Sequence, residues 1–373
     1  MIRLLYASTG DKDLLYALNF PVVHDPAFFL DLGAKKHLFL DRRELGVFEA
    51  INDNSSIEVL PLEPLLEQAR ASSDDTSAVN KVGQLIIEQY KLLDQEVAIA
   101  DSLPVSLVDW LRTRGATLVP TASLYPERHI KSPEEVEHIR AAHVKVQVAF
   151  RKIEAILRAS DIDGEYLRYR EELLTSERIK QEVELLLLAD NLVFDEGLIV
   201  SSGAQAAMPH HEGEGPLLAN QTIICDLFPR DRTTNYYADM TRTYVKGTPS
   251  PRIEKMYDAV LRAQEEALAS VRAGVSPETV HQAATATFEA RGFEVASDVG
   301  FIHGTGHGLG LDVHERPSLR AGEDEPLVAG NVVTIEPGLY YPKEGGVRIE
   351  DVIVVTADGY ENLTQYEKQL VIH

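Results

Sequence analysis

The chain has 373 residues, 44% of them hydrophobic and 25% charged, which favours two domains and an ordinary globular composition. Its 36 basic and 59 acidic residues give a formal net charge of −23, which disfavours binding to nucleic acid or to anionic membranes. The single cysteine, Cys225, excludes a disulfide within the chain. No apolar run approaches the roughly 18–20 residues of a membrane span, and the apolar start breaks at Gly10 before a secretory signal could form. We therefore expect a soluble protein of the cytoplasm.

The first part of the chain, residues 1–125, alternates stretches typical of strands and of helices. Two short apolar runs, His37–Leu40 and Glu96–Ala100, predict buried strands. Two stretches with helical spacing, Glu63–Ala71 and Ser106–Arg114, predict helices. This alternation indicates an α/β domain whose strands are at least partly parallel.

The character of the sequence changes near residue 130. The segment Ser132-Pro133-Glu134-Glu135 is typical of a helix start, with a capping serine, a proline at the first helical position and a glutamate three residues after the cap. We place a domain boundary at 125–131 and predict domains over 1–125 and 126–373. Two later helices follow the same pattern, one from Ser250 to Gly274 and one from Ser276 to Gly292.

Strand-like runs rich in Val, Ile and Thr lie between and after these helices, and they predict an α+β second domain with a mostly antiparallel sheet. The runs are Leu198–Val200, Thr222–Leu227, Thr241–Val245, Val332–Ile335 and Val347–Val355.

Two of these runs carry an aspartate each, Asp226 and Asp239. A hairpin centred near Arg232 and Thr233 would set the two aspartates opposite each other, with Cβ atoms ~5 Å apart. Two like charges at that distance on an apolar face are destabilising unless something positive lies between them.

The same arrangement is repeated by Glu336 and Glu350, which flank the glycine-rich turn Lys343–Gly346. Taken alone, each acid is best explained as an ordinary surface or edge residue. Two hairpins with a carboxylate pair on each instead favour a site for two hard or borderline divalent cations.

Three histidines follow one another closely at His303, His307 and His314, with alternating glycines at Gly304, Gly306, Gly308 and Gly310. The glycines allow a close approach of the backbone. The segment lacks the lysine and hydroxyl pair of a phosphate-binding loop and the HExxH pattern of zinc proteases. A lone histidine is more often a structural hydrogen-bonding group, but these three, together with His210, accompany the carboxylate pairs. His211 stays undecided.

Taken together, these motifs resemble the pita-bread metallopeptidases, in the branch of the Xaa-Pro aminopeptidases and prolidases. The resemblance is close over residues 131–373, and the first 125 residues match more loosely the small α/β (creatinase N-terminal-like) domain of that branch. It rests on Pro209-His210, on Asp226 with Asp239–Thr243, and on His303–Glu315, Thr334–Gly338 and Gly346–Asp351.

The resemblance implies a set of metal ligands. Asp226 would chelate one metal ion, Asp239 and Glu350 would bridge two, and His307 and Glu336 would complete the second. Carboxylate-dominated ligation favours Mn²⁺, with Co²⁺ and Zn²⁺ as alternatives.

The resemblance also implies roles around the metals. Glu336 would carry the proton from the attacking water to the leaving nitrogen. Outer histidines would position the substrate and stabilise the tetrahedral intermediate, and these are His210, His303 and His314. Arg348 would support the carboxylates from behind, and Tyr340 is a weaker candidate near the substrate.

Two segments depart from the family pattern. The stretch from Leu227 to Ala238 is longer than usual and has the unusual tip Pro229–Arg232, and Asp161–Glu172 is extra length. We expect both segments to reshape the mouth of the cleft. Arg230 or Arg232 would then be a candidate anchor for a substrate carboxylate.

The leading hypothesis is an exopeptidase for Xaa-Pro bonds of short peptides, of the aminopeptidase P or prolidase type, and the resemblance favours a homodimer. A metallo-carboxypeptidase or a broader dipeptidase on the same scaffold stays open. A methionine aminopeptidase is disfavoured by the preceding α/β domain, and a metal-free creatinase-like hydrolase by the complete ligand set. Outside the enzymes, a metal-free peptide-binding relative is the alternative.

Overall fold

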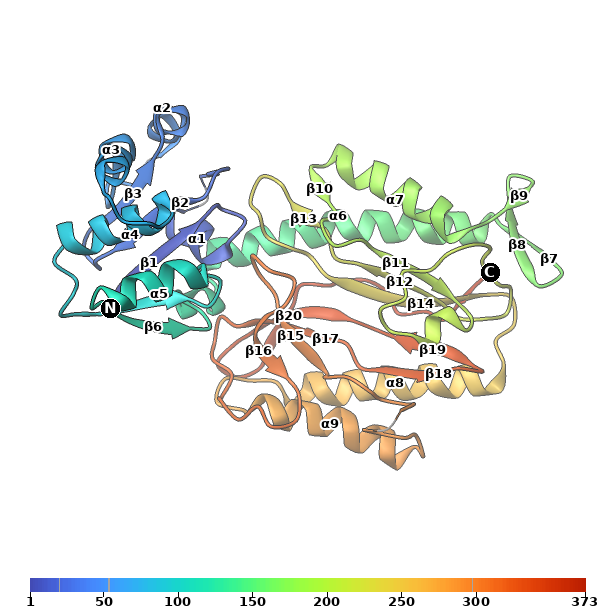
Figure 1. Cartoon of the computed structure of the whole chain (residues 1–373). Coiled ribbons are helices and arrows are strands. Elements are labelled where there is room, and N and C mark those ends of the chain that lie inside the picture. Colours follow the sequence, from blue (N-terminus) through green and yellow to red (C-terminus); the bar gives the residue numbers. More distant parts are fainter. Residues whose placement is uncertain (20, 53, 297) are drawn as a thin grey trace. The chain divides into compact units, whose positions relative to one another are not determined.

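The computed structural model describes the whole chain except residues 20, 53 and 297. The chain forms two compact units, Met1–Arg128 and His129–His373 (Figure 1). Each unit has a core and sheets of its own. Within the described ranges, no helix combines the length and the apolar character that a membrane crossing needs.

The first unit is built on a six-stranded sheet with the order β4-β3-β2-β1-β5-β6. Three neighbouring pairs, β1–β5, β5–β6 and β3–β4, are parallel, so the predicted α/β mixture with partly parallel strands is confirmed. The elements are β1 (Ile2–Ala7), α1 (Lys12–Ala17), β2 (Ala27–Asp31), β3 (Lys36–Leu40), α2 (Arg42–Ile51), β4 (Ile57–Pro61), α3 (Glu63–Ala71), α4 (Ala78–Gln89), β5 (Glu96–Ala100), α5 (Val105–Thr113) and β6 (Thr117–Thr121), followed by the 3-10 helix η1 (Pro126–His129).

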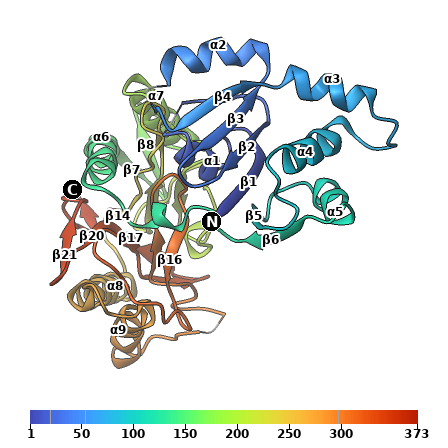
Figure 2. The same cartoon turned by 90° about the vertical axis from the view of Figure 1, so that its left-hand side faces the viewer.

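Both faces of this sheet are covered, because successive side chains of a strand point to opposite faces. Phe28 belongs to the core formed with α3, α4 and α5, and its neighbour Phe29 belongs to the core formed with α1 and α2. Figure 2 shows α4 and α5 next to each other, and these two helices are in contact.

The second unit contains two larger sheets, β11-β12-β14-β22 and β16-β15-β17-β20-β21, and the ribbon β18-β19. Its helices are α6 (Pro133–Arg158), α7 (Ser176–Ala189), α8 (Pro251–Ser270), α9 (Pro277–Ala290) and the 3-10 helix η2 (Gln205–Ala207). Its strands are β7 (Asp161–Asp163), β8 (Tyr166–Tyr169), β9 (Glu172–Leu173), β10 (Leu192–Val193), β11 (Ile199–Ser202), β12 (Ile223–Leu227), β13 (Arg230–Asp231), β14 (Met240–Lys246), β15 (Gly306–Gly308), β16 (Glu315–Leu319), β17 (Val332–Ile335), β18 (Gly338–Tyr341), β19 (Gly345–Arg348), β20 (Asp351–Val355), β21 (Tyr360–Asn362) and β22 (Val371–Ile372).

The sheets of this unit lie between two layers of helices (Figure 1). The core on one side joins α6 and α7 to β11, β12 and β14, and the core on the other side joins α8 and α9 to β17, β19 and β20. The helix start predicted at Ser132 is a complete capping box, in which Ser132 and Glu135 each accept from the other's backbone N–H. Among the strand pairs of the larger sheets, β14–β22 is parallel and the others are antiparallel, as predicted.

One predicted strand is wrong. The run Val347–Val355 forms two strands, β19 and β20, which pair with different partners. The break falls at Ile349 and Glu350, where the backbone N–H of Glu350 donates to the carbonyl of Thr241 in β14 (3.1 Å). This bond leaves Glu350 at the junction between the two sheets.

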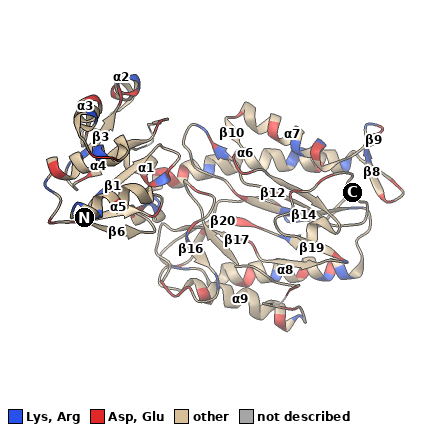
Figure 3. Ribbon diagram, viewed as in Figure 1, with Lys and Arg blue, Asp and Glu red and all other residues tan. Residues whose placement is uncertain are grey.

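Charged residues of the second unit lie mainly on the helices, but acidic residues also lie among the central strands (Figure 3). Asp226, Asp239 and Glu350 are each less than 10% exposed. A buried carboxylate needs hydrogen bonds or a counter-charge, so the centre of the unit is a candidate functional site.

Candidate metal centre

The five predicted ligands come from five separate segments of the second unit. Asp226 lies in β12 and Asp239 directly precedes β14. His307 is the central residue of β15, and Glu336 and Glu350 lie in the gaps between β17 and β18 and between β19 and β20. Because these strands belong to two different sheets, the cluster forms where the sheets meet.

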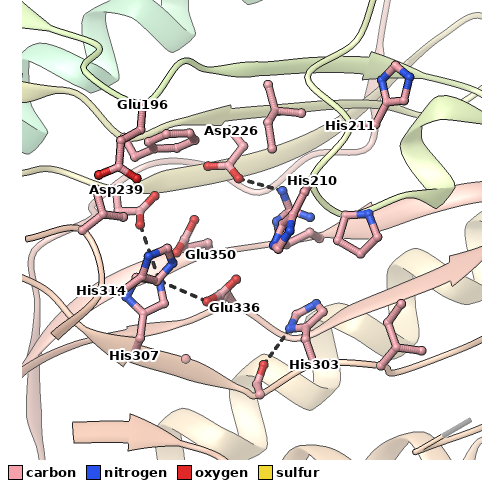
Figure 4. A pocket seen from close by; sticks show the side chains of 18 of the residues that line it. Glu196, His210, His211, Asp226, Asp239, His303, His307, His314, Glu336 and Glu350 are labelled. Carbon is pink, nitrogen blue, oxygen red and sulfur yellow. Dashed lines mark hydrogen bonds and ion pairs between the residues drawn. The ribbon is translucent and has the colours of Figure 1, made fainter. Parts of the chain in front are cut away.

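Three of the five side chains already have metal-binding spacing. One ligand atom each of Asp239, His307 and Glu350 lies within 4.8 Å of the others. His307 Nε2 is 3.7 Å from Asp239 Oδ2 and 3.3 Å from Glu336 Oε1 (Figure 4). Figure 4 also shows Asp226 directed toward the same cavity.

The predicted register of the first acidic hairpin is wrong. In the β12–β14 ladder Asp226 lies opposite Thr241, and Leu227 lies opposite Met240. Asp239 therefore stands outside the ladder and not directly across from Asp226. The reason is the hairpin tip, where β13 leaves the ladder and pairs with β10.

The predicted register of the second acidic pair is confirmed. Ile335 lies opposite Asp351 in β17–β20, and Gly338 lies opposite Arg348 in β18–β19. Both ladders have the same register, which sets Glu336 opposite Glu350 in the gap between them.

Burial and mutual repulsion perturb the carboxyl groups strongly. Burial, opposed only in part by Arg348, raises the pKa of Glu336 to about 8. Burial and then the charge of Glu350 raise the pKa of Asp239, and burial and then the charge of Glu336 raise the pKa of Glu350. Burial and the neighbouring His314 lower the pKa of His307 to about 3. Without a cation, these carboxyl groups either keep their protons or repel one another as carboxylates. Bound divalent cations would remove this repulsion.

A cationic side chain reaches this cluster at Arg348, which is 4% exposed. Its Nη2 donates to Asp226 Oδ2 (2.7 Å) and its Nη1 donates to the Tyr340 hydroxyl (2.8 Å). The other carboxylate oxygen, Asp226 Oδ1, is buried and accepts no hydrogen bond from the residues described. An uncompensated buried oxygen among hard donors fits a divalent cation.

The outer histidines line one cavity of about 910 Å³, together with the five ligands. His303 Nε2 is 2.9 Å from the Tyr340 hydroxyl, and burial lowers the pKa of His303 to about 4. The rings of His307 and His314 have centroids 4.3 Å apart. His210 and His211 also line the cavity, and His211 Nδ1 accepts from the backbone N–H of Gly213 (2.9 Å), which gives it a structural contact.

Two glycines beside His307 are required by the backbone packing. A Cβ atom on Gly306 would lie 1.9 Å from the carbonyl oxygen of Thr334, and one on Gly308 would lie 2.3 Å from that of Arg316. Such contacts are far inside van der Waals distance. The alternating glycines therefore place β15 tightly between its neighbours and fix His307.

Several supporting residues escaped prediction as individuals. Thr241 Oγ1 donates to Glu350 Oε2 (2.7 Å), and Arg242 Nη1 donates to the backbone carbonyl of Glu350 (2.6 Å). Both residues lie in the motif that carries the family resemblance, which was the available signal. His143, whose Nε2 is 3.0 Å from the carbonyl oxygen of Asp239, lies on α6 with no signal in the sequence.

The loop that carries His314 is held by a buried ion pair. Lys131 Nζ lies 2.7 Å from Glu315 Oε2, and both side chains are 1% exposed. Glu315 Oε1 accepts from the backbone N–H groups of Leu311 and Asp312. This loop is therefore rigidly connected to the start of α6.

Three residues predicted near the substrate are not among the described residues that line the cavity, namely Tyr340, Arg230 and Arg232. Tyr340 is buried behind His303, and Arg230 forms an ion pair with Asp195 (2.5 Å). The extra segment at Asp161–Glu172 forms β7, β8 and β9, and it does not contribute to the lining described for the cavity either. The longer hairpin reaches the cavity only through Phe228 among its described residues.

The chain is similar to known peptidases in sequence and in structure. A family described as metallopeptidase family M24 matches residues 137–357. An uncharacterised peptidase of Bacillus subtilis is 33% identical over 261 residues, which cover 69% of this chain and 68% of that protein. An Xaa-Pro dipeptidase of Pyrococcus horikoshii is 29% identical over 318 residues, which cover 83% and 84%. The solved structure of an Xaa-Pro dipeptidase from Bacillus anthracis superposes with a TM-score of 0.82 at 25% identity and covers 100% of this chain and 95% of that one.

Proposed function

Since the chain belongs to metallopeptidase family M24 and is therefore a metal-dependent peptide hydrolase, we propose that it cleaves Xaa-Pro bonds of short peptides as an exopeptidase. The observation that carries the proposal is that four carboxylates and His307 line one cavity of about 910 Å³, where one ligand atom each of Asp239, His307 and Glu350 lies within 4.8 Å of the others. Relatives and structural neighbours named Xaa-Pro dipeptidase support the substrate class.

The proposed ligand set is the one that the sequence predicts: Asp226, Asp239, His307, Glu336 and Glu350. Four carboxylates and one imidazole suit two divalent ions, and the excess of oxygen donors favours Mn²⁺ over Co²⁺ or Zn²⁺. When bound, such a pair supplies an activated water and polarises the scissile carbonyl.

The remaining chemistry belongs to side chains of the cavity. Glu336 takes the proton of the attacking water and passes it to the leaving nitrogen, because it lies beside His307 at 3.3 Å and faces the cavity. His303, held by the Tyr340 hydroxyl at 2.9 Å, donates to the oxyanion or positions the substrate. His210 and His314 contribute from the rim, where both are exposed to the cavity.

The apolar part of the cavity wall supports an apolar residue beside the scissile bond. Ile199, Phe228, Ile302 and Val313 line the cavity, and Ile302 is 38% exposed although it is a large apolar residue. A proline ring has the size and polarity to cover such a surface.

The tests are metal content and substrate class. We expect purified protein to bind about two divalent ions per chain by elemental analysis, and to hydrolyse Xaa-Pro dipeptides or Xaa-Pro-Zaa tripeptides with added Mn²⁺. Protein without bound metal that Mn²⁺ and Co²⁺ fail to activate would contradict the peptidase proposal and favour a peptide-binding relative. Cleavage of N-blocked peptides would instead favour a carboxypeptidase.

We also propose, from the family resemblance, that the protein is a homodimer, and we propose that it works in the cytoplasm. Light scattering on the purified protein tests the dimer, because a mass near 41.4 kDa would indicate a single chain and contradict it.

A further inference from the structure

A carboxylate that is not in the ligand set, Glu196, lines the same cavity. Its side chain is exposed, and within the described residues it accepts no hydrogen bond and forms no ion pair. Figure 4 shows Glu196 at the end of the cavity where Asp239 lies, away from His211 and His303. A carboxylate that faces a substrate cavity and forms no ion pair there can pair with a cationic group of a ligand.

The longer hairpin holds this residue in place. Strand β13 of the hairpin pairs with β10, so that Leu192 lies opposite Asp231 and Val193 lies opposite Arg230. Arg230 Nε then donates to Asp195 Oδ2 (2.5 Å), and the Tyr237 hydroxyl donates to the same oxygen (3.3 Å). Asp195 is thus engaged by the hairpin, while the adjacent Glu196 is left facing the cavity.

The other charges on the cavity wall outside the ligand set have partners. Arg320 donates twice to Glu323 (3.1 and 2.9 Å), and Arg348 donates to Asp226. Glu212, whose carboxylate lies against Gly197, has Lys180 at 4.0 Å. Glu196 is therefore the wall charge best placed to pair with a charged group of the substrate.

We propose that Glu196 forms a cation subsite, which selects peptides that bring an ammonium group to the Asp239 end of the cavity. This inference rests on the proposed peptidase function and names part of its specificity. The ammonium has two sources, the α-amino group of the substrate and a lysine side chain in the residue before the scissile bond. Either source would form an ion pair with Glu196. Because the same contact exists in the ground state and in the transition state, the ion pair should mainly lower KM and leave kcat unchanged.

Three matched substrates separate the two sources: Lys-Pro, norleucyl-Pro and hexanoyl-Pro. Norleucine lacks the side-chain ammonium of lysine, and the hexanoyl group lacks the α-amino group as well. We measure kcat/KM, or the inhibition constant where a compound is not hydrolysed, with the Mn²⁺-loaded protein and the variant Glu196→Gln. The wild type should prefer Lys-Pro over norleucyl-Pro if the side-chain ammonium binds, or norleucyl-Pro over hexanoyl-Pro if the α-amino group binds. We expect a preference of about threefold, as for an exposed ion pair.

The variant Glu196→Gln should lose that preference because its KM for the cationic substrate rises. In the wild type, the preference should decrease as added salt screens the charge. The matched control is Glu184→Gln on α7, which removes the same charge from an exposed position away from the cavity and should keep the wild-type ratios. Unchanged ratios in Glu196→Gln for both pairs would overturn the cation subsite. If the wild type hydrolyses and binds none of the three compounds nor longer Xaa-Pro peptides, the proposed function itself fails.

Discussion

The metal-ligand cluster and the cluster around Arg242 are both buried in the second unit, but they differ in charge balance. Asp351 is 0% exposed and is neutralised by Arg242 (2.9 Å) and Lys368 (2.6 Å), and the other Arg242 N–H groups donate to backbone carbonyls. The proposed ligand cluster has four carboxylates, and Arg348 is bonded to one of them, Asp226. One cluster is therefore balanced within the folded chain, whereas the excess of negative charge in the other favours the binding of cations from solution.

The strongest test of the unbalanced cluster is Glu350→Gln. The variant keeps the size of the side chain but removes a charge that would bridge both metals, so we expect metal content to fall to near zero. Activity should fall by about 10³-fold or more, equivalent to ~4 kcal/mol. Elemental analysis and steady-state kinetics measure both losses.

The fold should persist in Glu350→Gln, because the substitution relieves repulsion in the metal-free protein. Circular dichroism and thermal unfolding in the presence of a chelator provide the control. Retained metal and activity in this variant, or in Asp239→Asn, would sink the bridging assignment.

The balanced cluster should respond in the opposite way. Arg242→Met leaves the buried carboxylate of Asp351 with Lys368 as its counter-charge and a hydrogen bond from Asn362, and it removes the bonds to backbone carbonyls. We therefore expect a loss of about 3 kcal/mol in the free energy of unfolding. Chemical denaturation of the chelated protein measures it. The control is Arg262→Met, whose half-exposed ion pair with Glu265 should contribute less than about 1 kcal/mol. Equal effects of the two substitutions would contradict a stabilising role of the buried Arg242–Asp351 pair.

The pH dependence of the metal-free protein gives a third contrast. The pKa of Glu336 is raised to about 8, so its contribution to stability is fully present below the unfolded pKa and is lost as pH rises toward 8. The pKa of His307 is lowered to about 3, so its contribution is present above its unfolded value near 6.5 and is lost at lower pH. Between pH 6.5 and 8 the carboxyl groups therefore dominate. The free energy of unfolding should fall by about 1 kcal/mol per pH unit for each proton that the folded chain holds and the unfolded chain has lost.

Saturating Mn²⁺ should abolish this decline, since the cation replaces the protons and metal binding then releases them. Calorimetric titration in buffers of different ionisation enthalpy measures the release. A metal-free protein whose stability rises from pH 6.5 to 8 would contradict the repulsion described for the cluster.

The smallest expected effect concerns Thr241, which donates to Glu350 Oε2. Thr241→Val preserves the shape but removes the hydroxyl, and we expect metal affinity to fall about tenfold, with a smaller change in stability. Thr243→Val is the matched control, because the described hydrogen bonds of its hydroxyl join it to the backbone of Arg348 and to none of the proposed ligand side chains. A similar loss of affinity in both variants would show that Thr241 acts only through packing.

The register of the acidic pairs shows what the sequence could and could not predict. The pairing of Glu336 with Glu350 is predictable, because a short glycine-rich turn leaves little freedom to the register of the ladder. The pairing predicted for Asp226 and Asp239 is wrong, because their connection forms β13, which pairs with β10 outside the hairpin. Local pattern carries no information on such a pairing.

The supporting residues show the same limit. The family motif contains Thr241 and Arg242, so their proximity to Glu350 is within reach of sequence analysis. His143 of α6 contacts the backbone of Asp239, and Lys131, just before α6, pairs with Glu315. In the sequence each is an ordinary residue of a helix or of the segment that precedes it. Arg230 had the right type for a substrate anchor, but Asp195 occupies its guanidinium group, and the sequence does not reveal that pairing.

The distribution of the ligands over five strand segments has a consequence for the order of folding. The first proposed ligand is residue 226 and the last is residue 350, and the segments that carry them belong to different parts of the second unit. A half-folded chain would therefore offer at most part of the set, such as one acidic hairpin, and the long loops between the hairpins must close before the set is complete. Occupancy of the centre would then report that folding is finished, and the rate at which metal is captured during refolding would follow the slowest step of sheet assembly.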